Sequence, residues 1–239
     1  MIIGTIESRA LCKKIAKLTD TVVMGYSRGK DTLAAVVWLK EFFPRLILFY
    51  DDACPGLGIA ERSLAEMEER FGVTIERTVC QSLFESLGSM IYQPIEDEDL
   101  IDGMRFNEYP MSRDRTAELI RDKYDVGHAW IAWGISREDS IVRKSQKKYR
   151  EGINEAKRVF YPCFDWRREN VLQAITSSNL NLPEDYLLSS RSFASPLNPR
   201  GLLRMKEQFP EDFERVKFFY PFIEAALARN EFRRNHGKP

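Results

Sequence analysis

The sequence contains only two histidines and four cysteines in 239 residues, and no two cysteines form a CxxC pair. Zinc sites and disulfide frameworks both need such residues in tighter clusters. Metal-dependent hydrolysis through paired histidines is therefore excluded, and the cysteines are expected to be free thiols in a reducing compartment. A hydrolase with a His-activated Ser or Cys is also disfavoured, since its base would be His128, at the start of an apolar, strand-like run.

An excess of charge of one sign and long apolar runs are missing as well. The 36 Lys and Arg residues balance the 36 Asp and Glu residues, so no bulk positive field favours nucleic acids or anionic membranes. The longest apolar runs, residues 46–50 and 130–135, reach about a third of the ~20 residues that a membrane span needs. The N-terminus lacks the pattern of a signal peptide. We therefore expect a soluble, cytoplasmic protein with no membrane partner.

The composition is that of an ordinary globular protein, with 44% apolar and 30% charged residues. Strand-like apolar runs alternate with helical patterns along the chain. This alternation predicts right-handed crossovers and a doubly wound parallel sheet, that is, an α/β fold of the Rossmann-like kind. The expected strands are residues 21–25, 46–50, 73–79 and 129–133, and the expected helices are residues 33–43, 61–71 and 113–124.

Two regions depart from this alternation. Residues 80–111 carry an acidic cluster and are expected to form a long loop or a short helical insertion, which in compact domains is often a lid. Residues 165–239 are predicted to form a helical C-terminal region. The acidic cluster consists of Glu96, Asp97, Glu98, Asp99 and Asp102.

The chemically informative segment is residues 27–32 (SRGKDT), a tight polar turn between an expected strand and an expected helix. A helix N-terminus offers backbone N–H groups and a partial positive charge to a phosphate. Gly29 is expected to let these N–H groups converge on the anion. Ser27 and Thr32 add hydroxyl donors, and the basic side chains of the turn add charge. The alternative for such a turn is a helix N-cap with solvated charges.

The turn is not a Walker A loop, because Met24 and Asp31 stand where that motif has Gly and Ser or Thr. It resembles the SGGKDS loop of the adenine nucleotide α-hydrolase-like superfamily, the PP-loop ATP pyrophosphatases. In that family the loop holds the β- and γ-phosphates of ATP while chemistry occurs at the α-phosphorus and pyrophosphate leaves. The resemblance implies that the turn binds the nucleotide through Ser27, Arg28, Gly29, Lys30, Asp31 and Thr32, and that Lys30 and Asp31 take part in catalysis.

A later segment, residues 133–143, resembles the PAPS reductase branch of that superfamily, which has a strand-end Gly followed by Arg, an acid, Ser and a second Arg. Such a segment lies at the carboxyl end of a strand, where open α/β sheets bind ligands. The resemblance implies that Gly134 lies at the nucleotide, and that Arg137 and Arg143 clamp phosphate or sulfate oxygens and act in catalysis.

A further segment, residues 161–166 (YPCFDW), resembles the element of that branch that closes the fold beside the nucleotide. Asp165 is expected to be the N-cap of the next helix or a catalytic residue. The second strand ends at Asp51 and Asp52, where relatives carry an Asp that helps to place the nucleotide or Mg²⁺; turn aspartates are the alternative. Asp51 is the candidate magnesium ligand. The resemblance predicts a nucleotide-binding domain over residues 1–187 and a helical extension, residues 188–239, packed on it.

The resemblance to sulfonucleotide reductases is incomplete. Those enzymes attack sulfur with a Cys near the C-terminus, whereas this chain has no cysteine after Cys163, and its Lys-Asp pair is intact, as in ATP-using members. The clustered cysteines that hold an iron–sulfur cluster in some relatives are missing. Cys54 and Cys163 are candidates for a sulfur-carrying thiol, and a buried structural thiol is the alternative that we favour.

The sequence therefore predicts an enzyme that binds ATP with Mg²⁺ and adenylylates an acceptor with release of pyrophosphate, in sulfur transfer or in nucleic-acid modification. One alternative is a PAPS or APS reductase, or a sulfotransferase-like enzyme, that uses a partner protein's thiol. Another is a nucleotide-binding regulatory subunit without turnover. Small family members of this kind also occur in phage and mobile elements.

Two surface features bear on partners. Residues 137–150 are expected to form one helix with a basic face that could contact a nucleic acid, although a solvated face is favoured. An aromatic cluster near the C-terminus is expected to be core or a homodimer contact rather than a base-stacking platform. The basic residues are Arg143, Lys144, Lys147, Lys148 and Arg150, and the aromatic ones Phe218, Phe219, Tyr220, Phe222 and Phe232.

Overall fold

The computed structural model describes residues 4–88, 112–146, 151–189 and 199–236. The acidic cluster at residues 96–102 lies outside the described residues, as do Lys147, Lys148 and Arg150 of the predicted basic helix. In the part of the chain that is described, no helix is both long enough and apolar enough to cross a membrane.

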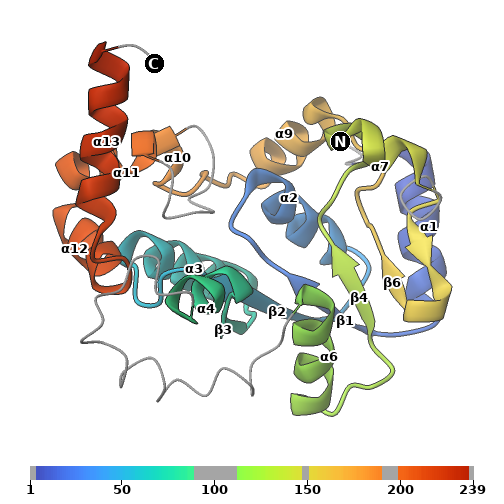
Figure 1. Cartoon of the computed structure of the whole chain (residues 1–239). Helices are drawn as coiled ribbons and strands as arrows, with labels where there is room; N and C mark the ends of the chain where they lie inside the picture. The colour runs from blue at the N-terminus through green and yellow to red at the C-terminus, as the bar shows by residue number, and fades with distance from the viewer. Residues whose placement is uncertain (1–3, 89–111, 147–150, 190–198, 237–239) are drawn as a thin grey trace. The chain divides into compact units, whose positions relative to one another are not determined.

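The described residues form a six-stranded sheet in the order β3-β2-β1-β4-β6-β5 (Figure 1). The β1–β2, β1–β4 and β4–β6 pairs are parallel, whereas β5 pairs with β6 in the antiparallel direction. The predicted doubly wound α/β sheet is confirmed, and the antiparallel edge was not predicted. The strands are β1 Thr21–Gly25, β2 Arg45–Asp52, β3 Ile75–Val79, β4 Trp130–Trp133, β5 Ile153–Asn154 and β6 Val159–Phe160.

Helices precede, connect and follow these strands. The helix predicted at residues 33–43 begins at Lys30, because Gly29 is its N-cap, and ends at Leu39, ahead of Pro44. The helices are α1 Ile6–Ala16, α2 Lys30–Leu39, α3 Gly58–Phe71, α4 Gln81–Gly88, α6 Arg113–Lys123, α7 Ile141–Ser145, α9 Arg168–Ser177, α10 Tyr186–Ser189, α11 Pro199–Gln208, α12 Pro210–Phe219 and α13 Ile223–His236, and the short 3₁₀ helices are η3 Arg137–Asp139 and η4 Glu155–Lys157.

The single helix predicted over residues 137–150 is wrong in its described part. The 3₁₀ helix η3 ends before Ser140, whose backbone is extended at φ −160°, and α7 ends before Gln146, which is extended as well. Ser136 contributes to the break, since its hydroxyl accepts the backbone N–H of Glu138 at 3.1 Å. Side-chain hydrogen bonds of this kind compete with a continuous helix.

The expectation that Asp165 caps the next helix is also wrong. Arg167 is the N-cap of α9, and its backbone N–H donates to the Asn170 side chain at 3.0 Å. Asp165 instead accepts a hydrogen bond from the hydroxyl of Thr5, before α1, at 2.5 Å. Its carboxylate therefore ties the start of α1 to the segment that follows β6.

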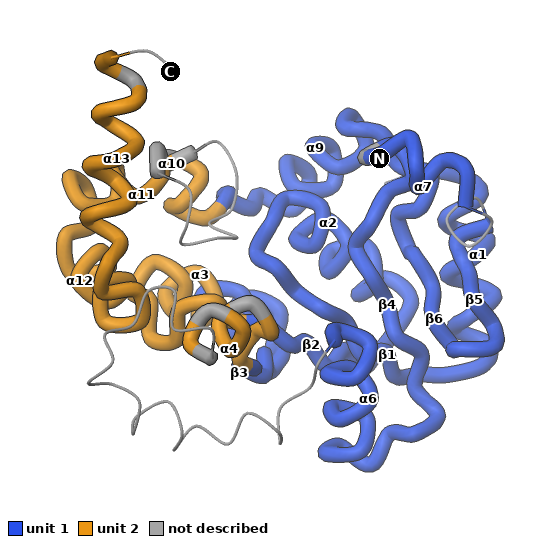
Figure 2. Tube along the Cα trace, in the orientation of Figure 1, with its two compact units in different colours: residues 1–51, 66–78, 112–182 blue, residues 52–65, 79–111, 183–239 orange. Residues whose placement is uncertain are grey.

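The chain divides into two compact units (Figure 2). The sheet unit comprises residues 1–51, 66–78 and 112–182, and the helical unit comprises residues 52–65, 79–111 and 183–239. The two predicted domains, residues 1–187 and 188–239, are each continuous in sequence, and that division stays a prediction.

Trp166 is central to the packing of the sheet unit. Its side chain is 1% exposed, and its ring meets the Trp38 ring of α2 edge-on, with the ring centroids 5.4 Å apart. The indole N–H donates to the Ser8 hydroxyl of α1 at 2.9 Å, and the Trp166 carbonyl accepts the Ser136 hydroxyl at 2.7 Å. Trp166 thus joins α1, α2 and the segment after β4.

The helical unit is organised around Asp212 of α12. This buried carboxylate accepts the backbone N–H groups of Gly58 and, at 3.1 Å, Ile59, and thereby caps the start of α3. Tyr220 donates its hydroxyl proton to the Ala53 carbonyl at 3.1 Å. The predicted helical C-terminal region is confirmed over residues 165–189 and 199–236, the part that the structure describes. In its aromatic cluster Phe219 and Tyr220 are buried, while Phe218, Phe222 and Phe232 are exposed, and the homodimer contact stays a prediction.

Ser8→Ala is expected to lower the free energy of unfolding by about 1–3 kcal/mol, because it removes the acceptor of a buried indole N–H and half of the α1 capping box. Urea denaturation measures the change. Lys13→Ala, at an exposed position of the same helix, is the control and should change stability by less than ~0.5 kcal/mol. Equal stability of Ser8→Ala and wild type would show that Trp166 does not depend on this bond.

Candidate nucleotide-binding site

Strand β1 lies at the point where the order of the strands in the sheet reverses. β2 pairs with one side of β1, and β4, later in the chain, pairs in parallel with the other. Ligands of open α/β sheets bind outside the carboxyl ends of the strands at such a switch point. The polar turn at residues 27–32 follows β1 at this end, and Gly134 follows β4.

Two hydroxyl groups hold the turn together. The Thr32 hydroxyl donates to the carbonyl of Gly29 at 2.9 Å, and Ser27 Oγ lies 3.2 Å from Thr32 Oγ1. Ser27 is exposed and Thr32 is buried. The structure therefore brings together the two hydroxyls that the sequence analysis singled out.

Helix α2 starts without a side-chain cap, because its N-cap residue is Gly29. The amides of its first turn thus present the partial positive charge of the helix with no capping side chain in front of them. Lys30 Nζ lies 2.7 Å from both carboxylate oxygens of Asp31, and both side chains are about one-third exposed, at 34% and 36%. An anion at this end of α2 would meet backbone dipoles and an accessible ammonium group.

The position of Arg28 differs from the prediction that its side chain adds charge at the phosphate. Its side chain is 1% exposed, with Cζ 5.7 Å from the centroid of the Tyr50 ring of β2. Arg28 also takes the left-handed backbone of the turn, at φ 61°, whereas Gly29 has an ordinary φ of −72°. Arg28 therefore anchors the turn, and its predicted contact with a nucleotide would require the side chain to leave Tyr50.

Gly134 lies directly against the turn. A Cβ atom at this position would stand 3.0 Å from Thr32 Cα, which is tighter than ordinary van der Waals contact with a backbone atom. The backbone that follows β4 and the first turn of α2 are therefore in contact, as the predicted site requires. A residue with a side chain here would require the backbone at Thr32 to move by a few tenths of an ångström.

The two predicted arginines follow β4. The Arg137 backbone N–H donates to the Phe164 carbonyl at 2.8 Å, and its guanidinium carbon lies 5.8 Å from the Phe164 ring centroid. Its Nε is 3.6 Å from a carboxylate oxygen of Glu138. Arg143 lies on α7 and is partly exposed. That Arg137 and Arg143 together bind phosphate oxygens stays a prediction.

Asp51, at the end of β2, is held within the sheet unit. It accepts the Thr78 hydroxyl at 2.9 Å and lies 3.5 Å from Arg113 Nε. Burial raises the pKa of its carboxyl group, against the opposing effects of these two partners. Among the described residues no group of three or more His, Cys, Asp or Glu side chains could hold a metal. An Mg²⁺ ion on Asp51 would therefore need phosphate and water oxygens, and this ligand role stays a prediction.

The surroundings of Asp52 and of the candidate thiols indicate structural roles. In the helical unit, buried Asp52 accepts the backbone N–H of Cys54 at 2.9 Å, which is the bond of a turn aspartate. Burial raises the pKa of the Cys54 thiol to about 12, and it also raises that of Cys163 well above its ordinary value. Because the thiolate is the reactive form, these environments support the alternative of structural thiols.

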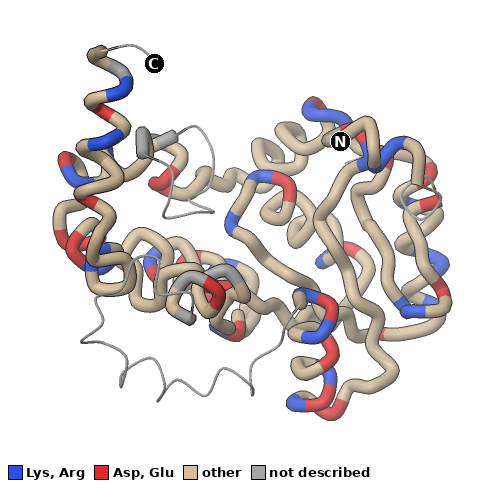
Figure 3. The backbone as a smooth tube through the Cα atoms, in the orientation of Figure 1, with Lys and Arg blue, Asp and Glu red and all other residues tan. Residues whose placement is uncertain are grey.

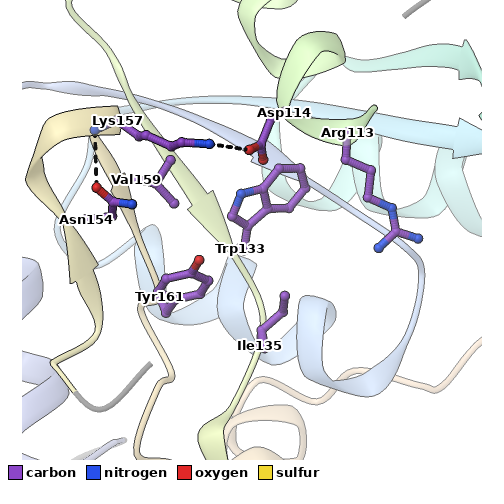
Figure 4. Close-up of a pocket in the computed structure, with 8 residues that line it drawn as sticks. All are labelled: Arg113, Asp114, Trp133, Ile135, Asn154, Lys157, Val159 and Tyr161. Atoms are coloured by element: carbon purple, nitrogen blue, oxygen red, sulfur yellow. Dashed lines mark hydrogen bonds and ion pairs between the residues drawn. The ribbon is translucent and has the colours of Figure 1, made fainter. Parts of the chain in front are cut away.

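The sheet unit also has a hollow of about 230 Å³ that the sequence analysis did not predict (Figure 4). Trp133 and Tyr161, at the ends of β4 and β6, line it, and an ion pair of 3.2 Å between Lys157 and Asp114 runs along one side. No local motif signals it, because its residues come from five elements and the segments beside them. They are Arg113, Asp114, Trp133, Ile135, Asn154, Lys157, Val159 and Tyr161.

No protein-family model and no curated protein sequence matches the chain. The solved structures that it resembles include NH3-dependent NAD synthetase from Campylobacter jejuni, at 12% identity over 95% of this chain and 94% of that one, with a TM-score of 0.47. The U34-tRNA thiolase NcsA from Methanococcus maripaludis is 14% identical over 91% and 79%, and phosphoadenylyl-sulfate (PAPS) reductase from Candida auris is 11% identical over 74% and 82%, both with TM-scores of 0.45. At identities of 11–14% and TM-scores below 0.5, these likenesses carry no argument about this chain.

Gly134→Ala is expected to weaken ATP binding about tenfold and to cost about 1–3 kcal/mol of stability, because the new methyl group would push the turn at Thr32 away. Calorimetric titration and urea denaturation measure the two effects. Gly127→Ala is the matched control, since a Cβ there meets no atom within 4 Å. Unchanged ATP binding by Gly134→Ala would remove the end of β4 from the site.

Native protein is expected to resist alkylation by iodoacetamide at pH 8 at Cys12 and Cys54, because pKa values of about 12 leave a thiolate fraction of about one in ten thousand. The buried Cys163 should resist as well, and the partly exposed Cys80 should react first. Mass spectrometry of tryptic peptides measures the order, with denatured protein as the control. Rapid labelling of Cys54 or Cys163 would restore the hypothesis of a sulfur-carrying thiol.

Proposed function

We propose that this chain is a PP-loop enzyme that binds ATP at the turn of residues 27–32 and catalyses transfer of the adenylyl group to an acceptor. The acceptor's nucleophilic atom forms a bond to the α-phosphorus, the bond from that phosphorus to the oxygen bridging the α- and β-phosphates breaks, and pyrophosphate leaves. The acceptor proton passes to water. The observation that carries the proposal is the contact of Gly134 with Thr32 at the switch point of the sheet.

The residues of the turn suit the pyrophosphate part of the nucleotide. The uncapped start of α2 offers backbone N–H groups, and Ser27 and Thr32 offer hydroxyls from the same end. Lys30 can exchange its partly exposed pairing with Asp31 for a phosphate oxygen, since an ion pair that water reaches contributes little stability. Fixed donors of this kind stabilise a leaving group that gains negative charge.

Three charged groups of the sheet unit complete the proposed site. Arg137 and Arg143 would face the charge that develops at the α-phosphorus, and guanidinium forks match phosphate oxygens in geometry. Asp51 would hold Mg²⁺ together with the phosphates. The ion would supply further charge neutralisation at the pyrophosphate.

The hollow lined by Trp133 is the candidate binding site for the acceptor. Trp133 and Ile135 both line it, and they flank Gly134, which touches the turn. An acceptor in this hollow would lie next to the backbone that contacts the proposed nucleotide site. Its aromatic walls and its charged side favour a flat ring that carries polar groups.

A PAPS-using enzyme that relies on a partner's thiol is the second candidate. The burial of Cys54 and Cys163, which raises the pKa of both thiols, favours it over a reductase that uses either of these two cysteines. Such a protein would bind PAPS in preference to ATP and release sulfite with a thiol partner. A regulatory subunit would bind nucleotide without releasing any product.

Lys30→Ala is expected to reduce ATP affinity by at least about tenfold, because it removes a charge-assisted contact with the phosphates. The measurement is calorimetric titration of ATP and of PAPS, each with Mg²⁺, into wild type and variant, with binding of ATP to wild type expected in the micromolar range. Lys13→Ala, exposed on α1, is the matched control.

Equal ATP affinities of Lys30→Ala and wild type would contradict the proposed site. Binding of PAPS alone would move the second candidate ahead. If ATP binds, pyrophosphate release with candidate acceptors distinguishes an enzyme from a regulatory subunit.

A further inference from the structure

A second hollow, of about 280 Å³, adjoins the first within the sheet unit. The two hollows share Asp114, Lys157 and Val159. No residue of the turn at 27–32 lines the second hollow, which is therefore a different place from the proposed nucleotide site. Its charged lining residues are Arg121, Lys157 and Arg158, with Asp114 and Glu118.

Arg121 is the unusual member of this set. It is 8% exposed, although arginine is almost never so deeply buried unless it is paired. One Nη atom donates to the Arg158 carbonyl at 3.3 Å, and its buried Nε has no acceptor in the described part of the chain. Burial lowers the pKa of its guanidinium and the nearby charge of Arg158 lowers it further, while the charges of Glu118 and Asp122 act in the opposite direction. The buried Nε of Arg121 is therefore a donor without a hydrogen-bond partner among the described residues.

The acidic side chains of the hollow are engaged elsewhere. Asp114 pairs with Lys157 at 3.2 Å, and Glu118 pairs with Arg115, on the outer part of α6, at 3.2 Å. Figure 3 shows how acidic and basic residues alternate along α6. No carboxylate among the described residues forms an ion pair with Arg121 or Arg158. Glu118 and Asp122 are close enough to favour the charged form of Arg121, but neither forms an ion pair with it. The buried guanidinium of Arg121 and the exposed Arg158 thus lie at the same hollow, an arrangement that an anion would stabilise.

The backbone holds this arrangement in place. The Arg158 carbonyl accepts the backbone N–H of Ile131 at 2.9 Å as well as the Arg121 guanidinium. Arg121 is therefore fixed against the pairing of β4 with β6 rather than free to move into solvent. Arg121 is thus a donor positioned before the ligand arrives, which lowers the entropy lost on binding, whereas the exposed Arg158 side chain would order with the ligand.

We propose that this hollow is a binding site for a tetrahedral oxyanion, a phosphate or sulfate group, held by Arg121 and Arg158 with Lys157 at its edge. Guanidinium groups bind such oxygens through two parallel hydrogen bonds, and two of them can satisfy more oxygens than a carboxylate has. The adjoining hollow, with Trp133 and Tyr161, has room for the ring of a phosphate ester. The site takes either the free ion or the phosphate of an ester.

The test uses Lys30→Ala protein as the parent, so that the turn at residues 27–32 does not contribute. Thermal unfolding and calorimetry at low ionic strength follow titration with inorganic phosphate and with uridine 5′-monophosphate. Phosphate is expected to raise the melting temperature of the parent. Adding Arg158→Asn should weaken phosphate binding about tenfold through loss of a charge-assisted hydrogen bond. Asn tolerates the left-handed backbone of residue 158, at φ 49°, and should fold.

Arg121→Met tests the buried charge directly. Without phosphate this variant should be as stable as the parent or more stable, and phosphate should not raise its melting temperature. Arg168→Gln makes the same change of net charge at an exposed position of α9 that does not line the hollow, and it should keep the phosphate affinity of the parent. In otherwise wild-type protein, Arg158→Asn should leave ATP binding unchanged, which separates this site from the proposed function.

Equal losses of phosphate affinity in Arg158→Asn and Arg168→Gln would overturn the proposal, because net charge alone would then explain the binding. Absence of any effect of phosphate and of the monophosphate on the parent would also overturn it. Binding of the monophosphate that is tighter than that of phosphate, and that falls to the phosphate level in Trp133→Ala, assigns the site to a phosphate ester. Equal binding of the two assigns it to the free ion.

Discussion

The closeness of Gly134 to Thr32 depends on the register of two parallel strands. Gly25, the last residue of β1, is paired with Trp133, the last residue of β4, so that both strands end at the same level. Gly25 must also lack a side chain, because a Cβ there would stand 2.3 Å from the Trp133 ring. Two glycines, one on each chain segment, thus set the spacing of the turn and the strand end. The proposed nucleotide site makes use of that spacing.

The segments that resemble family motifs have different physical roles. Residues 27–32 and Gly134 lie at the ends of the central strands, where a ligand can reach them. Trp166 and Asp165, by contrast, are hydrogen-bonded to Ser8 and Thr5, and they hold α1 in place within the sheet unit. A motif near a site therefore includes residues that maintain the frame as well as residues that face the ligand.

Local patterns predicted the sheet and the polar turn well. Residues 22–24 and 46–50 are continuous apolar runs, and strands that are buried on both faces of a parallel sheet have such runs. Helix α1 was not predicted, because its signal in the sequence is short and consists of the capping box of Thr5 and Ser8. Residues 137–150 looked helical because charged residues favour helices, but hydroxyl groups and an extended Ser140 interrupt them.

The remaining features depend on contacts between distant parts of the chain. The burial of Arg28 results from the Tyr50 ring on the next strand, and nothing in the sequence around Arg28 indicates it. The two hollows combine side chains from α6, from β4 and from the segments around η4. Sequence periodicity describes one element at a time, so neither hollow could be predicted from it.

The position of Arg28 has a thermodynamic consequence for the turn. A left-handed backbone at a residue other than glycine is costly, and burial of the Arg28 side chain beside the Tyr50 ring offsets part of this cost. The buried Arg28 side chain therefore fixes the turn, while Ser27 stays exposed to solvent. The conformational entropy of these residues is lost when the chain folds, and not when an anion arrives. The turn is in this sense preorganised, because the free energy of folding, and not that of ligand binding, offsets the cost of its conformation.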